Sequence, residues 1–191
     1  MKDRERAVQL DGWNRWPAKL GGRPDWPQPN LPPPDYSTAE GRLAMLVERV
    51  PRFEVETTQG KFTMAFTARG ESPLNVLNFR DLVAKKFYDG ISWHRVVPNF
   101  VVQGGDPRGD GSGGPGHLVP CEYNSYPYIA GTVGMALDGK DTGGSQFFVA
   151  LTRVPHLDYH YTVLGQVEAG MEVLYKLGED DKIISIRELE Q

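Results

Sequence analysis

Hydrophobic and polar residues alternate along the chain with two different periods, and these periods predict where strands and helices lie. From Phe53, apolar and polar residues alternate with a period of two through FEVET and KFTMAFT, and TQG separates the two runs. Because successive side chains of a strand point to opposite faces, this pattern predicts a β-hairpin. A helix is predicted to follow, with Ser72 as its N-cap and Pro73 in its first turn. Its apolar residues recur at helical spacing, and they are Val76, Phe79, Val83 and Phe87.

Beyond Gly90 the apolar segments are short, rich in β-branched and aromatic residues, and interrupted by glycine. Five of them are predicted to be strands, and they read ISWHRVV, FVVQGG, GTVGMAL, SQFFVAL and YTVLGQV. The stretch from Gly170 to Gly178 predicts one more short helix, and IISIREL predicts a last strand. Many short strands with two helices favour a closed or nearly closed antiparallel barrel.

The first fifty residues have a different composition. Prolines are crowded between Trp13 and Asp35, and the run LPPP favours an extended polyproline II conformation. We therefore interpret residues 1–52 as a proline-rich arm or linker, and residues 53–191 as the main domain. Two alternatives stay open for the tryptophans of the arm: they fasten it to the main domain by burying their rings, or they dock on a partner. These tryptophans are Trp13, Trp16 and Trp26.

One short helix is predicted at the end of this arm. Ser37 and Glu40 have the spacing of a capping box, in which each side chain satisfies a free backbone amide. Four apolar residues then recur on one helical face before Pro51 ends the helix, and they are Leu43, Leu46, Val47 and Val50.

Length and charge restrict the class of protein without identifying it. A chain of 191 residues can bury a core without disulfides or metal, and its single cysteine, Cys121, excludes an internal disulfide. The net charge of −4 is too weak to indicate nucleic acid or an anionic membrane as a partner. No run approaches the roughly 20 apolar residues of a membrane span, and the start, MKDRERAVQLDGW, is unlike a secretory signal. We expect a cytoplasmic protein, unless the sequence is a piece of a longer exported one.

Several short motifs have a simpler interpretation than their usual function. The run GDGSGG fits a dinucleotide fingerprint, but Pro115 follows it where a helix would have to begin, so it predicts a surface loop. Arg108 occupies a position that a calcium loop needs for a ligand. His156 and His160 lie four residues apart, but Pro155 and a following strand favour a turn over a zinc-binding helix. Ser145 lacks the second glycine of a nucleophile elbow. We expect no metal and no cofactor.

The stretch from Phe87 to Asp106, FYDGISWHRVVPNFVVQGGD, contains an arginine, aromatic residues and a glutamine, but no nucleophile paired with a base. Together with GMALDGKDTGGSQFF and HLDYHYTVLG, this stretch resembles the cyclophilin family of peptidyl-prolyl isomerases. The resemblance runs from about Phe53 to Leu189. The family pattern of the first stretch is met with one change, Trp93 in place of phenylalanine.

The resemblance implies a mainly β fold, a cyclophilin-like closed antiparallel barrel of eight strands capped by two α-helices. It implies rotation about X-Pro bonds in proline-containing peptides and unfolded proteins, which assists protein folding. Arg95 is the candidate donor to the twisted bond, with Gln103 and Phe100 as the other catalytic candidates. His94 precedes Arg95, so its side chain should face the opposite side, and we interpret it as structural. The substrate-binding candidates are Val101, Ala136, Leu137, Gln146, Phe148, His156, Leu157 and Tyr161.

Three positions depart from the common family pattern. Many members have tryptophan where this chain has His156, and that position contributes to binding of cyclosporin, so reduced affinity for this drug is expected. Leu137 stands where asparagine is common, which removes a side-chain contact to substrate. Tyr161, rather than His160, aligns with a position that is often histidine. A binding module that grips proline-containing segments without useful turnover is the alternative function, and LPPPD is itself a candidate ligand for the pocket.

Overall fold

The computed structural model describes residues 50–67 and 71–190. The predicted arm, its three tryptophans and its short helix therefore lie outside the described residues. The division into residues 1–52 and 53–191 stays a prediction. None of the helices in the described part of the chain has the length and the apolar character needed to span a bilayer.

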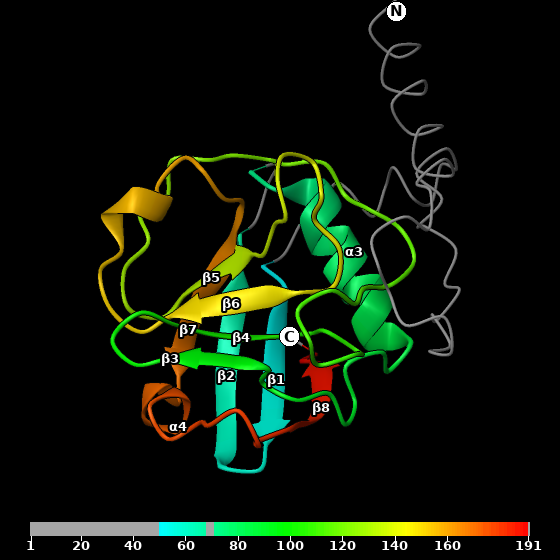
Figure 1. Ribbon diagram of the computed structural model, residues 1–191, viewed down its shortest axis with the longest axis vertical. Helices are drawn as coiled ribbons and strands as arrows, with labels where there is room; N and C mark the ends of the chain where they lie inside the picture. The colour runs from blue at the N-terminus through cyan, green and yellow to red at the C-terminus, as the bar shows by residue number, and fades with distance from the viewer. Residues whose placement is uncertain (1–49, 68–70, 191) are drawn as a thin grey trace, which may run out of the picture.

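The described residues form eight strands, two α-helices and a short 3-10 helix, and every strand expected beyond Phe53 is present (Figure 1). The predicted hairpin and the predicted first helix are confirmed, and the second helix is shorter than the stretch that predicted it. In chain order the elements are β1 (Arg52–Thr57), β2 (Gly60–Phe66), α3 (Pro73–Ala84), β3 (Arg95–Val97), β4 (Val101–Gly104), β5 (Thr132–Met135), β6 (Phe147–Ala150), the 3-10 helix (Pro155–Leu157), β7 (Val163–Ala169), α4 (Met171–Leu174) and β8 (Ile183–Glu188).

The strands form one curled antiparallel sheet in the order β3-β4-β6-β5-β7-β2-β1-β8. The expected full closure is found only in part, because no ladder joins the two edge strands, β3 and β8. An isolated bridge between Ser92 and Lys182 joins the segments that lead into them. Backbone hydrogen bonds support it, with Trp93 N–H donating to Asp181 at 3.0 Å and Ile183 N–H donating to Ile91 at 2.8 Å. The sheet is therefore a barrel that closes at one end of its seam.

The main core is the larger of two apolar clusters, and it fills the inside of the curled sheet. Strands β1 and β2 supply alternate side chains to it, as their period of two predicts. Helix α3 adds Val76, Phe79, Leu82 and Val83, and α4 adds Val173 and Leu174 from the opposite end of the sheet (Figure 1). Its largest members are the aromatic side chains of Phe53, Phe62, Phe66, Phe79, Tyr88, Trp93 and Phe147.

Helix α3 begins where Ser72 and Pro73 predict, but Ser72 does not cap it. The Ser72 hydroxyl instead donates to the Val163 carbonyl at 3.0 Å. The carboxylate of Glu122 accepts hydrogen bonds from the backbone N–H groups of Leu74 at 3.1 Å and Asn75 at 2.9 Å. A negative charge at a helix N-terminus is favourable, because the free N–H groups and the helix dipole both attract it. A distant residue therefore does what the adjacent serine was expected to do.

Candidate active site

Strand register brings two of the three catalytic candidates, Arg95 and Gln103, into one row with the substrate-binding candidate Phe148. Arg95 on β3 lies opposite Gln103 on β4, Gln103 lies opposite Phe148 on β6, and Phe148 lies opposite Gly134 on β5. Directly opposed residues on adjacent strands have their side chains on the same face of a sheet. The antiparallel ladder thus places a guanidinium, an amide and an aromatic ring side by side, although 53 residues separate the first from the last.

A second apolar cluster, which we call the pocket cluster, lies on this face of the sheet. Its buried members are Val101, Tyr128, Phe148, Ala150, Val154, Leu157 and Val163, and the half-buried Phe100, Ala136 and Tyr161 pack against it. Neighbours on one strand divide between the clusters, since Phe147 belongs to the main core and Phe148 to the pocket cluster. The structure therefore brings together Phe100, Val101, Phe148, Leu157 and Tyr161, which the sequence analysis had assigned to one site.

Arg95 lies exposed at the rim of the pocket cluster. Its guanidinium carbon is 5.5 Å from the centre of the Phe100 ring, and its Nη1 donates to Oε1 of Gln103 at 3.4 Å. Within residues 50–67 and 71–190, no carboxylate lies within ion-pair distance of Arg95. The guanidinium carries five N–H donors, so most of them remain available to a ligand lying over Phe100.

The glutamine candidates are bound to each other. Gln103 Nε2 donates to Oε1 of Gln146 at 3.0 Å, and Gln146 Nε2 donates to the carbonyls of Gly111 and Gly113, each at 2.9 Å. Gln146 was expected to line a substrate groove, yet its amide is occupied at both ends. Its position fits a residue that holds Gln103 in place.

The turn that carries His156 and Leu157 is fastened to the rest of the molecule. Asp158 accepts a hydrogen bond from the Tyr128 N–H at 2.8 Å and pairs with Arg153. The hydrogen bond from Arg153, followed by that from the Tyr128 backbone, lowers the pKa of Asp158 below its usual range. Leu157 is buried, while His156 is exposed and stacks on Phe100 with ring centres 5.6 Å apart.

Two candidates on the strand β5 side differ from the others. The backbone N–H of Ala136 donates to the Gln146 carbonyl at 3.0 Å, so the main-chain group that Ala136 can offer a peptide is its carbonyl. Leu137 packs against the main core rather than the pocket cluster. Its assignment to substrate binding stays a prediction.

His94 directly precedes β3, and its side chain is half-buried. Both of its ring nitrogens are buried. Burial lowers the pKa of His94, and the nearby charge of Asp106 opposes this only in part. A neutral imidazole therefore adjoins the site, which agrees with a structural interpretation of this residue.

Sequence reasoning missed Tyr128 and Gly134. The Tyr128 ring is fully buried and stacks on Phe148 with centres 5.4 Å apart. A Cβ atom at Gly134 would lie 2.4 Å from the Tyr128 hydroxyl and 2.6 Å from the Phe148 ring, so only glycine leaves room for this stack. Tyr128 lies in an irregular segment, where no hydrophobic period marks a residue as buried. Gly134 lies in a predicted strand, where an isolated glycine often signals a close approach of other groups.

The short motifs discussed in the sequence analysis lie in the following places. The described residues contain no cluster of three or more side chains suited to hold a metal ion. His156 lies in a short 3-10 helix and His160 in the turn after it, and the residues of GDGSGG form a loop. The Ser145 hydroxyl is buried and donates to the Gly105 carbonyl at 2.6 Å. A cleft of about 520 Å³ exists elsewhere, between Phe87–Ser92 and Asp106–Gly109, and it contains none of the predicted site residues. Most of the predicted site residues instead gather at the pocket cluster, with Arg95 exposed at its rim.

Comparison with known proteins gives the class that this fold and site indicate. Residues 52–187 match the family model described as cyclophilin type peptidyl-prolyl cis-trans isomerase/CLD. The chain is 44% identical to a peptidyl-prolyl cis-trans isomerase of Synechococcus elongatus over 135 residues, which is 70% of this chain and 92% of the relative. It is 45% identical to peptidyl-prolyl cis-trans isomerase B of Bacillus subtilis over 118 residues, which is 61% of this chain and 82% of the relative.

Solved structures agree with these sequence matches. A cyclophilin-type peptidyl-prolyl cis-trans isomerase of Cryptosporidium parvum superposes with a TM-score of 0.70 at 25% identity, covering 75% of this chain and 99% of that one. The same isomerase in the presence of the dipeptide Ala-Pro gives a TM-score of 0.68 at 26% identity, with 73% and 99% covered. The chain belongs to the cyclophilin-type family of peptidyl-prolyl cis-trans isomerases, and it is an enzyme of that class.

Proposed function

We propose that Arg95, Gln103 and Phe100 carry out the cis–trans isomerisation of X-Pro bonds, with the proline ring seated against the pocket cluster. The observation that carries this assignment is an arginine without an acidic partner in the described residues, held over an aromatic ring at the rim of an apolar surface. Substrates of this site are proline-containing peptides and unfolded proteins.

The reaction needs no nucleophile, because no covalent bond is made or broken. A peptide bond resists rotation by about 18–20 kcal/mol, since its nitrogen lone pair is delocalised onto the carbonyl. In the twisted state the lone pair is localised on nitrogen and accepts a hydrogen bond. A guanidinium N–H aimed at that nitrogen binds the twisted state more tightly than either planar state, which lowers the barrier.

The apolar side chains contribute by orienting the proline and by excluding water. Phe100, Phe148 and Leu157 form the surface for the ring, with Val101 at its base. Water excluded from this surface cannot compete for the donors of Arg95, so their hydrogen bond to the substrate is strengthened. Gln103 keeps the guanidinium directed over Phe100, and Ala136 offers its carbonyl to the substrate backbone.

The experiment that tests the assignment is a proline-limited refolding assay with Arg95→Ala and Arg95→Lys. A hydrogen bond from a charged donor contributes about 1.5–3 kcal/mol, so kcat/KM is expected to fall roughly 10- to 150-fold in Arg95→Ala. Arg95→Lys should recover only part of the loss, because lysine keeps the charge but lacks the planar fork. Arg187→Ala is the matched control, since Arg187 is an exposed strand arginine on β8.

A binding module is the competing function, and the same variants separate the two. An isomerase loses turnover in Arg95→Ala while it retains binding of an Ala-Pro peptide through the pocket cluster. Unchanged turnover in Arg95→Ala would refute the role of Arg95. A wild-type protein that binds the peptide without accelerating refolding, and that loses affinity in Arg95→Ala, would favour a module that grips proline segments.

Two finer properties also belong to this proposal. His156 stacks on Phe100 as a small exposed ring, which supports the expected reduction in affinity for cyclosporin relative to family members that carry tryptophan there. Assistance to protein folding and a cytoplasmic location remain proposals, to be tested with refolding clients and with fractionation of cells that express the full chain.

A further inference from the structure

The direction of Arg95 depends on polar contacts rather than on burial. Its side chain is exposed, and its one hydrogen bond within the described residues runs to Gln103 at 3.4 Å. An exposed arginine samples many rotamers, and each rotamer other than the productive one removes the donor from the substrate nitrogen. The contacts that hold the side-chain oxygen of Gln103 in position therefore also hold the guanidinium of Arg95 in its productive rotamer.

The polarity of the glutamine chain is set at its far end. The carbonyls of Gly111 and Gly113 can only accept hydrogen bonds, so they require the NH₂ group of Gln146 to face them. The oxygen of Gln146 must then face Gln103, which turns the NH₂ group of Gln103 toward Gln146. The remaining oxygen of Gln103 faces Arg95. Reversing either side-chain amide would place two donors or two acceptors opposite each other.

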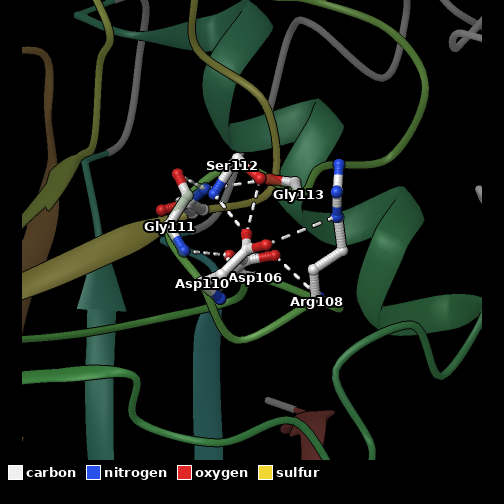
Figure 2. Close-up of polar contacts among 7 residues, drawn as sticks. Asp106, Arg108, Asp110, Gly111, Ser112 and Gly113 are labelled. Atoms are coloured by element: carbon white, nitrogen blue, oxygen red, sulfur yellow. Dashed lines mark hydrogen bonds and ion pairs between the residues drawn. The ribbon is translucent and has the colours of Figure 1, made fainter. Parts of the chain in front are cut away.

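The two carbonyls belong to a loop that is built around one buried carboxylate. Asp106 is 1% exposed, and it accepts hydrogen bonds from the backbone N–H groups of Arg108 at 2.7 Å, Asp110 at 3.1 Å and Gly111 at 2.6 Å (Figure 2). Gly113 packs against the same carboxylate, because a Cβ atom there would lie 2.0 Å from Oδ1 of Asp106. Asp106 therefore determines where both carbonyls point.

We propose that Asp106 is a positioning residue for the isomerisation. It acts through the loop of residues 108–113, which orients Gln146, then Gln103, and finally the guanidinium of Arg95. This inference rests on the proposed function, since it assigns a means of orienting the donor that the proposed function uses. Asp106 does not itself touch the substrate, and its loss should affect turnover more than substrate binding.

Asp106→Asn is the variant that tests the inference, because it preserves size while removing acceptor capacity. One amide oxygen replaces two carboxylate oxygens, and the new NH₂ group opposes the backbone N–H groups of the loop. We expect kcat to fall about tenfold while KM changes less than about twofold. We also expect the side-chain NH₂ resonances of Gln146 to move toward the positions of a solvent-exposed amide. Asp180→Asn is the matched control: it removes the same charge from an exposed aspartate outside the loop of residues 108–113.

Combining Asp106→Asn with Arg95→Ala separates this inference from the proposed function. If Asp106 acts through Arg95, the double variant should have the kcat of Arg95→Ala alone. Unchanged turnover in Arg95→Ala would refute the proposed function. A full effect of Arg95→Ala, together with an additive effect or no effect of Asp106→Asn, would refute the inference about Asp106 and leave the proposed function intact.

Gly113→Ala keeps the inference testable if Asp106→Asn fails to fold. The added methyl group displaces the same carboxylate from the other side of the loop without removing any charge. Turnover should fall and the Gln146 resonances should shift in the same direction as for Asp106→Asn. A folded Gly113→Ala protein with wild-type turnover and wild-type Gln146 resonances would overturn the positioning of Arg95 by this loop.

Discussion

The main core and the pocket cluster are built from the two faces of the same strands, yet they differ in how completely they are enclosed. On β4, Val102 faces the main core and Val101 the pocket cluster, and on β6 the same division separates Phe147 from Phe148. Helices α3 and α4 both contribute to the main core. The pocket cluster has no α-helix over it among the described residues, and half-buried side chains such as Phe100 and Tyr161 form its border. The enclosed face stabilises the fold, and the open face leaves apolar surface for a proline ring.

The largest difference is expected between Phe147→Ala and Phe148→Ala. Truncating Phe147 leaves a closed cavity in the main core, so the free energy of unfolding should fall by about 3–5 kcal/mol in urea denaturation. Phe148→Ala should destabilise less, because the space that it leaves opens toward the pocket surface, but it should remove most of the isomerase activity. Equal destabilisation by both variants, with activity preserved in Phe148→Ala, would abolish the distinction between the clusters.

A pair of leucines sharpens the comparison at a smaller scale. Leu157 in the pocket cluster and Leu177 in the main core are similarly buried, at 7% and 5% exposed. Leu157→Ala removes apolar contact with the proline ring, so KM for a peptide substrate should rise roughly 5- to 30-fold. Leu177→Ala should lower the melting temperature and leave KM unchanged. If Leu177→Ala raised KM and Leu157→Ala only lowered the melting temperature, the substrate surface would lie elsewhere.

The smallest effect concerns His94, which lies between Trp93 of the main core and Arg95 at the pocket rim. Burial lowers the pKa of His94 in the folded state, so below about pH 6.5 the unfolded chain binds a proton that the folded chain does not. The free energy of unfolding should therefore decrease as the pH falls below this value. His94→Gln should weaken that decrease, and the exposed His160→Gln serves as control. An identical pH dependence in His94→Gln and the wild type would contradict this assignment.

Much of the fold follows from local patterns, and the exceptions depend on distant residues. The strands were predicted because alternation and glycine punctuation are properties of short segments. The extent of barrel closure could not be predicted in this way, because it depends on the pairing of Ser92 with Lys182, which are 90 residues apart. The cap of α3 was assigned to Ser72 because the serine is adjacent, whereas the structure uses Glu122.

The candidate site shows the same limit. In SQFFVAL both phenylalanines are apolar, so alternation alone cannot tell which faces the pocket, and the family resemblance supplied the choice. The structure places Phe148 in the pocket cluster, in agreement with it. The burial of Tyr128 was not predicted, because its segment has no hydrophobic period. The hydrogen bonds from Gln146 to the loop were not predicted either, because every residue has a backbone carbonyl and the sequence does not show which ones accept a side-chain hydrogen bond.

The capping of α3 by Glu122 has a consequence for the order of folding. Starting a helix is the costly step of its formation, and here the group that relieves this cost lies 47 residues beyond Asn75. Strands β3 and β4 and the Asp106 loop all lie within that interval. An excised peptide covering the helix lacks this carboxylate and should show little helical signal by circular dichroism. We therefore expect α3 to become stably ordered only when the segment that carries Glu122 has reached it.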